Sequence, residues 1–257
     1  MPQPRIITKT ESDEPTMRLA VLIDADNAQA SVIENLLAEI ARYGEATVKR
    51  IYGDFTSAAS SSWKKDLQRF AIKPIQQFAY TTGKNATDST LIIDAMDLLY
   101  TRKFDGFCLV SSDSDFTGLA MRIREEGLSV FGFGEKKTPE AFRNACHKFI
   151  FTEVLRTERE HSFEPAEHHK TKIESEKHSF PTKLVMAALE QSDDESGWAN
   201  LGTFGSYLTK LLPEFDPRNY GYKKLSELVK AKPMLFETEE RNTSGSNTKQ
   251  LYVRAKK

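Results

Sequence analysis

Short apolar runs alternate with amphipathic segments from Arg18 to about Thr152. Apolar runs bounded by turn residues predict buried strands, and apolar residues every three or four positions predict helices that pack on one face. Strands are expected at 18–24, 46–54, 72–80, 106–112 and 128–134. Helices are expected at 31–42, 61–70, 88–100, 115–127 and 139–149. This alternation is typical of an α/β fold with three layers, in which a mostly parallel sheet is covered on both faces.

The pattern changes at both ends of this region. Residues 1–17 are polar and lack an apolar period, which predicts a flexible tail. Residues 156–180 are highly charged and nearly free of aliphatic side chains, which is typical of a linker. Four of the five histidines fall in this linker, at spacings that do not place three of them on one helical face. We therefore expect one domain over 18–155 and a second over 181–257.

The second region predicts a small α+β domain. Amphipathic helices are expected at 182–192, 200–215 and 223–231, and alternating strands at 234–240 and 249–256. Three helices followed by a β-hairpin in so short a region describe a winged-helix arrangement, which is a variant of the helix-turn-helix.

Charge and cysteine content limit the setting in which the protein works. The chain has 257 residues and a formal net charge of −1, so any surface for nucleic acid must come from local separation of charges. Its two cysteines form no CxxC pair and no secretory segment is present at the N-terminus, so a reduced, cytoplasmic setting is expected. No apolar run reaches the length of a membrane-spanning helix, so we expect a soluble protein without a membrane partner.

Carboxylates follow two of the expected strands at the point where each strand ends. Asp24 ends the first strand, with Asn27 just beyond it, and Asp113 and Asp115 follow the 106–112 strand. In an open α/β sheet, ligands bind outside the carboxyl ends of the strands. Residues two apart in an extended segment point to the same side, so Asp113 and Asp115 are expected to face one site. Carboxylates this close repel each other and resist desolvation, which a bound cation would offset.

A third segment adds another acid. On a helical wheel, Asp88 begins the apolar face of the 88–100 helix rather than its solvent face. Three segments thus bring four aspartates toward one edge of the sheet: Asp24, Asp88, Asp113 and Asp115. Oxygen-rich, sulfur-free ligands suit Mg²⁺ or Mn²⁺, and such a site favours hydrolysis of phosphodiesters. The alternative is that each aspartate only caps a helix.

These segments resemble the NYN family of PIN-like nucleases, in particular its LabA-like branch. The matching motifs are VLIDADNA at 21–28, GKNATDSTLIIDAMD at 83–97 and LVSSDSDFTGLAMRIREEGLSVFGFG at 109–134. The resemblance implies a Rossmann-like, metal-dependent ribonuclease domain with an acidic pocket. It also implies that the four aspartates are catalytic metal ligands and that Asn27 is a further catalytic residue. Ser112 stands where relatives usually have glycine.

Residues 197–237 resemble the LOTUS family, also called OST-HTH. WANLGTF at the second helix and FDPRNYGYKKLSELV before the third are close to the pattern of that family. Its members bind RNA or protein partners, so the resemblance implies RNA as a partner and leaves a protein partner open. Aromatic rings beside cations can stack on bases and pair with phosphates, which makes RNA-binding candidates of Arg218, Tyr220, Tyr222, Lys223 and Lys224. The alternative is that the tyrosines pack in the core and the lysines are solvated.

Other cations lie near the expected carboxyl edge of the first domain. Lys84, Lys136 and Lys137 are in loops that follow strands, and Arg143 is in the helix after one of these loops. We expect them to hold phosphates of the RNA backbone, although surface cations need no such role.

Together these features predict an RNA-processing protein. We expect a ribonuclease domain that uses Mg²⁺ or Mn²⁺, in which a metal-activated water attacks a phosphodiester, joined to a C-terminal RNA-binding module. One alternative is an RNA-binding regulatory scaffold with an idle acidic pocket. A second is a small-molecule phosphohydrolase, since DADNA at 24–28 is similar to the DxD motif of haloacid-dehalogenase-like phosphatases. Ala28, however, stands where those enzymes have Thr or Val.

Overall fold

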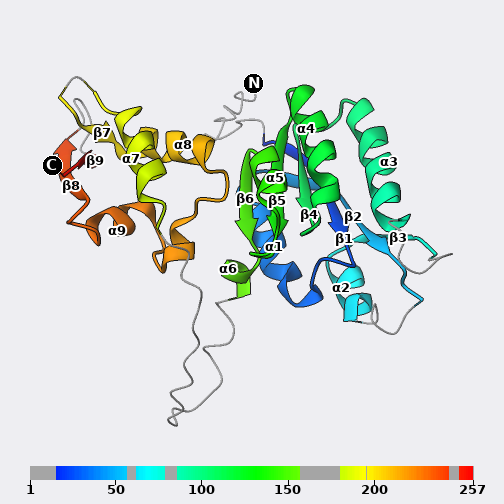
Figure 1. Ribbon diagram of the computed structural model, residues 1–257. Helices are drawn as coiled ribbons and strands as arrows, with labels where there is room; N and C mark the ends of the chain where they lie inside the picture. Colours follow the sequence, from blue (N-terminus) through cyan, green and yellow to red (C-terminus); the bar gives the residue numbers. More distant parts are fainter. Residues whose placement is uncertain are drawn as a thin grey trace, which may run out of the picture.

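The chain forms two folded regions that lie side by side (Figure 1). The structure is a computed structural model that describes residues 16–56, 62–78, 86–156, 180–194, 196–242 and 249–256. Lys84 and most of the expected linker lie outside the described residues. No described helix is long and apolar enough to cross a membrane.

A parallel six-stranded sheet forms the centre of the first region. Its order is β3-β2-β1-β4-β5-β6, and each neighbouring pair is parallel. The strands are β1 (Arg18–Asp24), β2 (Glu45–Gly53), β3 (Lys73–Gln76), β4 (Gly106–Val110), β5 (Ser129–Gly134) and β6 (Lys148–Phe151). Pro74, which cannot donate a ladder hydrogen bond, lies in β3 at one edge of the sheet.

Helices cover both faces of this sheet (Figure 1). They are α1 (Ile33–Ile40), α2 (Trp63–Arg69), α3 (Ala86–Tyr100), α4 (Thr117–Glu125), α5 (Glu140–Ala145) and α6 (Glu153–Arg156). Alternate residues of β1 belong to two separate cores: Leu22 packs with α3, α4 and α5, whereas Val21 and Ile23 pack with α1 and α2. A strand buried on both faces needs a continuous apolar run, and the run LAVLI at 19–23 is the feature that predicted β1. The three-layer α/β fold is therefore confirmed.

The strand order reverses direction between β1 and β4. The chain runs from β1 outward to β2 and β3, and then returns to β4 and runs outward the other way to β5 and β6. Loops leave the carboxyl ends of β1 and β4 in opposite directions, which opens a crevice at this switch point. Asp24 ends β1, and Asp113 lies three residues beyond the end of β4.

The helix expected at 139–149 is wrong in its second half. It ends at Ala145, and Lys148–Phe151 forms the edge strand β6 beside β5. Gly132 on β5 permits this packing, because a Cβ there would lie 2.5 Å from a ring carbon of Phe149. The four residues of β6 are too few for periodicity to separate strand from helix, so only the pairing with β5 decides.

The second region has the expected winged-helix arrangement of three helices and an antiparallel sheet. Its elements are α7 (Thr182–Glu190), β7 (Ala199–Asn200), α8 (Leu201–Leu211), α9 (Leu225–Lys230), β8 (Phe236–Asn242) and β9 (Lys249–Ala255). The hairpin strands β8 and β9 pair antiparallel, and the short β7, which the sequence pattern did not predict, adds to β9. Apolar residues of all three helices and the sheet share one core, which includes Val185, Phe204, Leu228 and Val253.

Candidate functional site

Three aspartates meet at the carboxyl edge of the sheet. Asp88 lies in the first turn of α3, whereas Asp113 and Asp115 belong to the turn that joins β4 to α4. One carboxylate oxygen from each of the three lies within 4.8 Å of the others. Asp113 caps the short 3-10 helix Ser114–Phe116, because its Oδ1 accepts a hydrogen bond from the backbone N–H of Asp115 at 2.9 Å. This cap orients the Asp113 carboxylate beside that of Asp115.

Burial and repulsion both act on Asp88. Burial is the largest cause that raises its pKa, and the negative charges of Asp24, Asp113, Asp115 and Asp26 add to the effect, so that the pKa reaches about 6. An acid with a pKa near 6 binds a proton far more readily than an ordinary aspartate, and a divalent cation would relieve the same repulsion. The set contains only carboxylate oxygens, which fits Mg²⁺ or Mn²⁺ and does not fit softer metals.

Asp24 is fully buried behind hydrogen bonds of its own. Its carboxylate accepts hydrogen bonds from Ser111 Oγ at 2.7 Å, Asn27 Nδ2 at 2.8 Å and the backbone N–H of Asp26 at 3.0 Å. Burial raises the pKa of Asp24, and these three hydrogen bonds oppose that rise. Among the described residues, Asp24 is not in the group of three close carboxylates. Its direct ligation of a metal therefore stays a prediction, as does a contact between Asn27 and substrate.

Ser111 is a residue of this site that the sequence reasoning missed. It is buried, and its Oγ donates to Asp24 and accepts from the backbone N–H of Asp113 at 3.1 Å. One hydroxyl thus links the ends of β1 and β4 across the switch point. A serine at a strand end directly before an Asp-x-Asp is the signal that could have identified it. Asp26, which is exposed, was also missed, and its charge acts on Asp88.

Asp94 anchors the helix that carries Asp88. Its carboxylate accepts hydrogen bonds from the guanidinium of Arg50 and the hydroxyl of Tyr52, both on β2. Burial and this contact raise the pKa of Tyr52. The three side chains hold α3 against β2 and so position the first turn of α3 at the carboxyl edge.

The comparisons with known proteins agree with this geometry. The family model described as the NYN domain matches residues 18–156, which is more than half of the chain. The chain belongs to the NYN family. A second family model, the OST-HTH/LOTUS domain, matches residues 175–248. A nuclease-type domain and an RNA-binding type of domain are thus present in one chain.

Three solved structures are similar to parts of the chain. An uncharacterized protein of Nitrosomonas europaea is 57% identical over 36% of this chain and 89% of its own, with a TM-score of 0.31. A protein of unknown function from Vibrio parahaemolyticus is 19% identical over 55% of this chain and 94% of its own, with a TM-score of 0.45. Residues 175–257 of a Chromobacterium violaceum protein are 33% identical over 31% of this chain and 83% of that fragment, with a TM-score of 0.25. No curated protein matches the chain.

Two of the predicted RNA-binding arginines join the NYN and OST-HTH domains to each other. Arg143 of α5 pairs with Glu214, at 3.2 Å between Nη1 and Oε1. Arg218 donates to both carboxylate oxygens of Glu39 on α1, at 2.9 and 3.1 Å. Arg218 also pairs with Asp216 in its own domain, at 2.6 Å. These guanidinium groups therefore have a structural role at the domain junction, and their contact with RNA stays a prediction.

A backbone contact adds to the two ion pairs. The N–H of Phe149 on β6 donates to the carbonyl oxygen of Pro213 at 2.9 Å, so the OST-HTH domain covers part of the exposed edge of the sheet. An unpaired edge strand can pair with other chains, and this contact blocks part of it.

The remaining predicted RNA contacts divide into packed and exposed side chains. Tyr220 packs in the OST-HTH core, with its ring 5.3 Å from Phe180 and 5.5 Å from Phe215, and burial raises its pKa to about 12. Tyr222 is half-buried against the same core. The exposed lysines are Lys136 and Lys137 after β5, and Lys223 and Lys224 before α9; of these, Lys137 pairs with Glu135 at 3.0 Å.

Proposed function

We propose that this protein is a ribonuclease that requires Mg²⁺ or Mn²⁺ and holds its RNA with both domains. The observation that supports this most directly is the convergence of Asp88, Asp113 and Asp115 within 4.8 Å in an NYN domain. These carboxylates come from two separate segments and gather where their mutual repulsion is costly. A divalent cation bound by their oxygens would remove that cost.

The acids of the site have two tasks in this proposal. Asp88, Asp113 and Asp115 hold the metal, and the buried Asp24 adds negative charge beside them. Ser111 and Asn27 orient Asp24, since both donate hydrogen bonds to its carboxylate. When bound, Mg²⁺ or Mn²⁺ polarises the scissile phosphodiester and lowers the pKa of a water molecule.

The proposal is tested by RNA cleavage with a matched pair of variants. Labelled single-stranded RNA is incubated with Mg²⁺, Mn²⁺ or EDTA and with wild type, Asp113→Asn or Asp97→Asn. Asn keeps the size of Asp113 and can still cap the following turn, so the fold is retained while a ligand charge is lost. Asp97 lies on the exposed side of α3 and serves as the control for the same substitution.

We expect metal-dependent cleavage by wild type and by Asp97→Asn. The cleavage rate of Asp113→Asn should be lower by at least about 100-fold, because removal of a residue that only supports a metal ligand already costs 10–100-fold in activity. Equal rates in wild type and Asp113→Asn would mean that the site is wrongly assigned. RNA binding without cleavage in either metal would instead favour an RNA-binding scaffold. Hydrolysis of nucleotides but not RNA would favour a small-molecule phosphohydrolase.

A further inference from the structure

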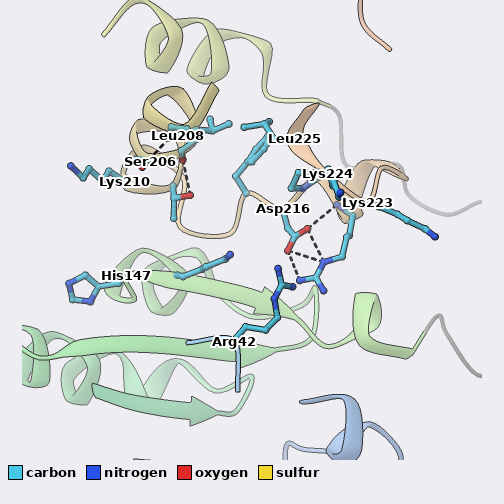
Figure 2. A pocket seen from close by; sticks show the side chains of 16 residues that line it. Arg42, His147, Ser206, Leu208, Lys210, Asp216, Lys223, Lys224 and Leu225 are labelled. Carbon is cyan, nitrogen blue, oxygen red and sulfur yellow. Dashed lines mark hydrogen bonds and ion pairs between the residues drawn. The ribbon is translucent and has the colours of Figure 1, made fainter. Parts of the chain in front are cut away.

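A cleft of about 690 Å³ separates the NYN and OST-HTH domains at the edge strand β6. Figure 2 shows Arg42 and His147 on one side of this cleft and Lys210, Lys223 and Lys224 on the other. Lys148, at the start of β6, lines it as well. Arg42 and Lys148 of the NYN domain and three lysines of the OST-HTH domain therefore face one space, although the formal net charge of the whole chain is −1.

The acidic group that lines this cleft, Asp216, and the nearby Glu39 are both paired with arginines. Asp216 accepts hydrogen bonds from the backbone N–H, Nε and Nη2 of Arg218. Glu39 accepts from Arg218 and from Arg42. By contrast, none of Lys148, Lys210, Lys223 and Lys224 forms an ion pair with another described residue. The charge left over at the cleft is positive.

Lys148 is the most informative of these cations. Its side chain is half-buried, and its Nζ lies 5.3 Å from the ring centre of Tyr43. Burial lowers its pKa, while the charges of Asp216 and Glu39 act in the opposite direction. A cation that has lost solvent without gaining a contact ion pair is costly, and an anion bound in the cleft would offset this cost.

The positive surface continues toward the acidic site. A second cleft, of about 480 Å³, shares Arg218 and Lys223 with the first and is also lined by Lys136, Tyr222 and one acid, Glu153, which accepts a hydrogen bond from the backbone N–H of Lys136. Lys136 follows β5 at the carboxyl edge of the sheet, the edge at which Asp113 follows β4. The two clefts together extend from the amino end of β6 to the edge that holds the aspartates. An extended polyanion matches such a surface better than a single small anion does.

From this arrangement we infer that the interdomain cleft binds the phosphate backbone of a single-stranded RNA segment, with Lys148 and Lys210 as phosphate contacts from opposite domains. The inference rests on the proposed function, because it takes the substrate of the aspartate site as the polymer that fills the cleft. Rings lie beside the cations and can stack on unpaired bases: Tyr222 lines the second cleft, and Lys210 Nζ is 5.4 Å from the ring centre of Tyr207.

The test measures binding without cleavage. The full chain carrying Asp113→Asn is titrated in EDTA against a fluorescently labelled uridine oligoribonucleotide, at several salt concentrations. Lys148→Gln and Lys210→Gln are added to this parent separately and together. Lys103→Gln and Lys183→Gln are the matched controls, because both lysines are exposed, one in each domain, and line neither cleft. Circular dichroism establishes that each variant is folded.

We expect Lys210→Gln to weaken binding about two- to fivefold, the range of one exposed ion pair, and Lys148→Gln, at a half-buried position, to weaken it at least as much. We also expect the slope of log affinity against log salt to become less steep by about 0.7 for each lysine removed, the value for a single-stranded phosphate contact. The two controls should keep the affinity and slope of the parent. Unchanged affinity and slope in the double cleft variant would overturn the inference.

A second arm separates RNA from an acidic protein partner. Labelled polyglutamate is titrated against the same variants. If the cleft substitutions weaken polyglutamate binding and leave RNA binding unchanged, the cleft serves an acidic polypeptide and the inference is wrong. Because neither titration requires cleavage, an inactive wild type would contradict the proposed function without affecting this result. If wild type cleaves RNA and the cleft substitutions leave RNA binding unchanged, only the inference is contradicted.

Discussion

Asp88 is half-buried and Glu39 is buried, and the charges that surround these two carboxylates are of opposite sign. Asp88 lies among other aspartates, and burial together with their charges raises its pKa to about 6. Glu39 is only 5% exposed, and burial alone would raise its pKa as well. The guanidinium of Arg218 overrides that tendency and holds the pKa of Glu39 below its ordinary value.

The protein thus places carboxylates in two kinds of surroundings, beside guanidinium groups and beside other carboxylates. At the domain junction each carboxylate has a guanidinium partner, so the charges are balanced within the protein and join two domains. At the carboxyl edge of the sheet, by contrast, Asp88 lies among the like charges of Asp24, Asp113, Asp115 and Asp26, which add to the rise of its pKa. Removing one charge should therefore have opposite effects on stability in the two regions.

The largest effect is expected at the junction. Arg218→Ala leaves Glu39 and Asp216 buried without their main partner, and we expect it to lower the free energy of unfolding by about 3 kcal/mol. Urea unfolding at neutral pH measures this change. Since the pKa of Glu39 is depressed in the folded protein, the contribution of the pair is present above pH 4.5 and is lost as the pH falls through the folded value.

Arg42→Ala is the control for this prediction. Arg42 pairs with the same Glu39 at 3.2 Å, but its side chain is 65% exposed, so its removal should cost less than about 1 kcal/mol. Equal losses in the two variants would show that the buried geometry of Arg218 has no special importance.

An intermediate effect is expected at Ser111. Ser111→Ala removes the donor to buried Asp24 and the acceptor of the Asp113 backbone N–H. We expect a loss of about 2 kcal/mol in the free energy of unfolding in EDTA, because buried polar groups are left unsatisfied. Ser114→Ala, at an exposed position of the same segment, should change stability by less than about 0.5 kcal/mol. A stable Ser111→Ala protein would mean that the hydroxyl does not link the two strand ends.

The smallest effect, of opposite sign, is expected at Asp88. Its pKa is raised from 3.8 to about 6 in the folded protein, so metal-free wild type should lose stability as the pH rises between these values. Asp88→Asn should remove this loss. In EDTA at pH 7 its free energy of unfolding should exceed that of wild type by about 1 kcal/mol, after allowance for solvent screening at a half-buried group, and its melting temperature should be higher. Melting curves in EDTA from pH 4 to pH 7 measure it.

Addition of Mn²⁺ sharpens this last prediction. A bound ion stabilises a protein more when it binds more tightly, so Mn²⁺ should raise the free energy of unfolding of wild type more than that of Asp88→Asn. If Asp88→Asn is less stable than wild type in EDTA at pH 7, the acids of this site are not in mutual repulsion.

Much of the NYN fold could be predicted because its signals are local. β1 is apolar between Arg18 and Asp24, β4 is apolar throughout and is followed by Asp113, and Asp88 opens a helix on its apolar side. These features predicted the parallel sheet and the edge at which the acids gather. β6 was missed because four residues next to a helix have no distinctive period, and only hydrogen bonds with β5 make them a strand.

The roles of the cations could not be predicted in the same way. Arg143 and Arg218 were expected to hold RNA, yet each pairs with a carboxylate of the other domain, 71 and 179 residues away in the sequence. Ser111 was missed for a related reason, since its bond to Asp24 spans 87 residues. No periodicity or spacing reports contacts over such separations.

Neighbouring residues were enough to predict the classes of the two domains, the strands buried on both faces and the four candidate aspartates, because burial and backbone preference are local. Which charges are neutralised depends on the folded chain. It paired Arg218 with Glu39, left Lys148 half-buried without an ion pair to a described residue, and brought Asp88 within 4.8 Å of Asp113 and Asp115. The physical reason is that electrostatic energy depends on distance in space and on burial, and both are set only when the chain has folded.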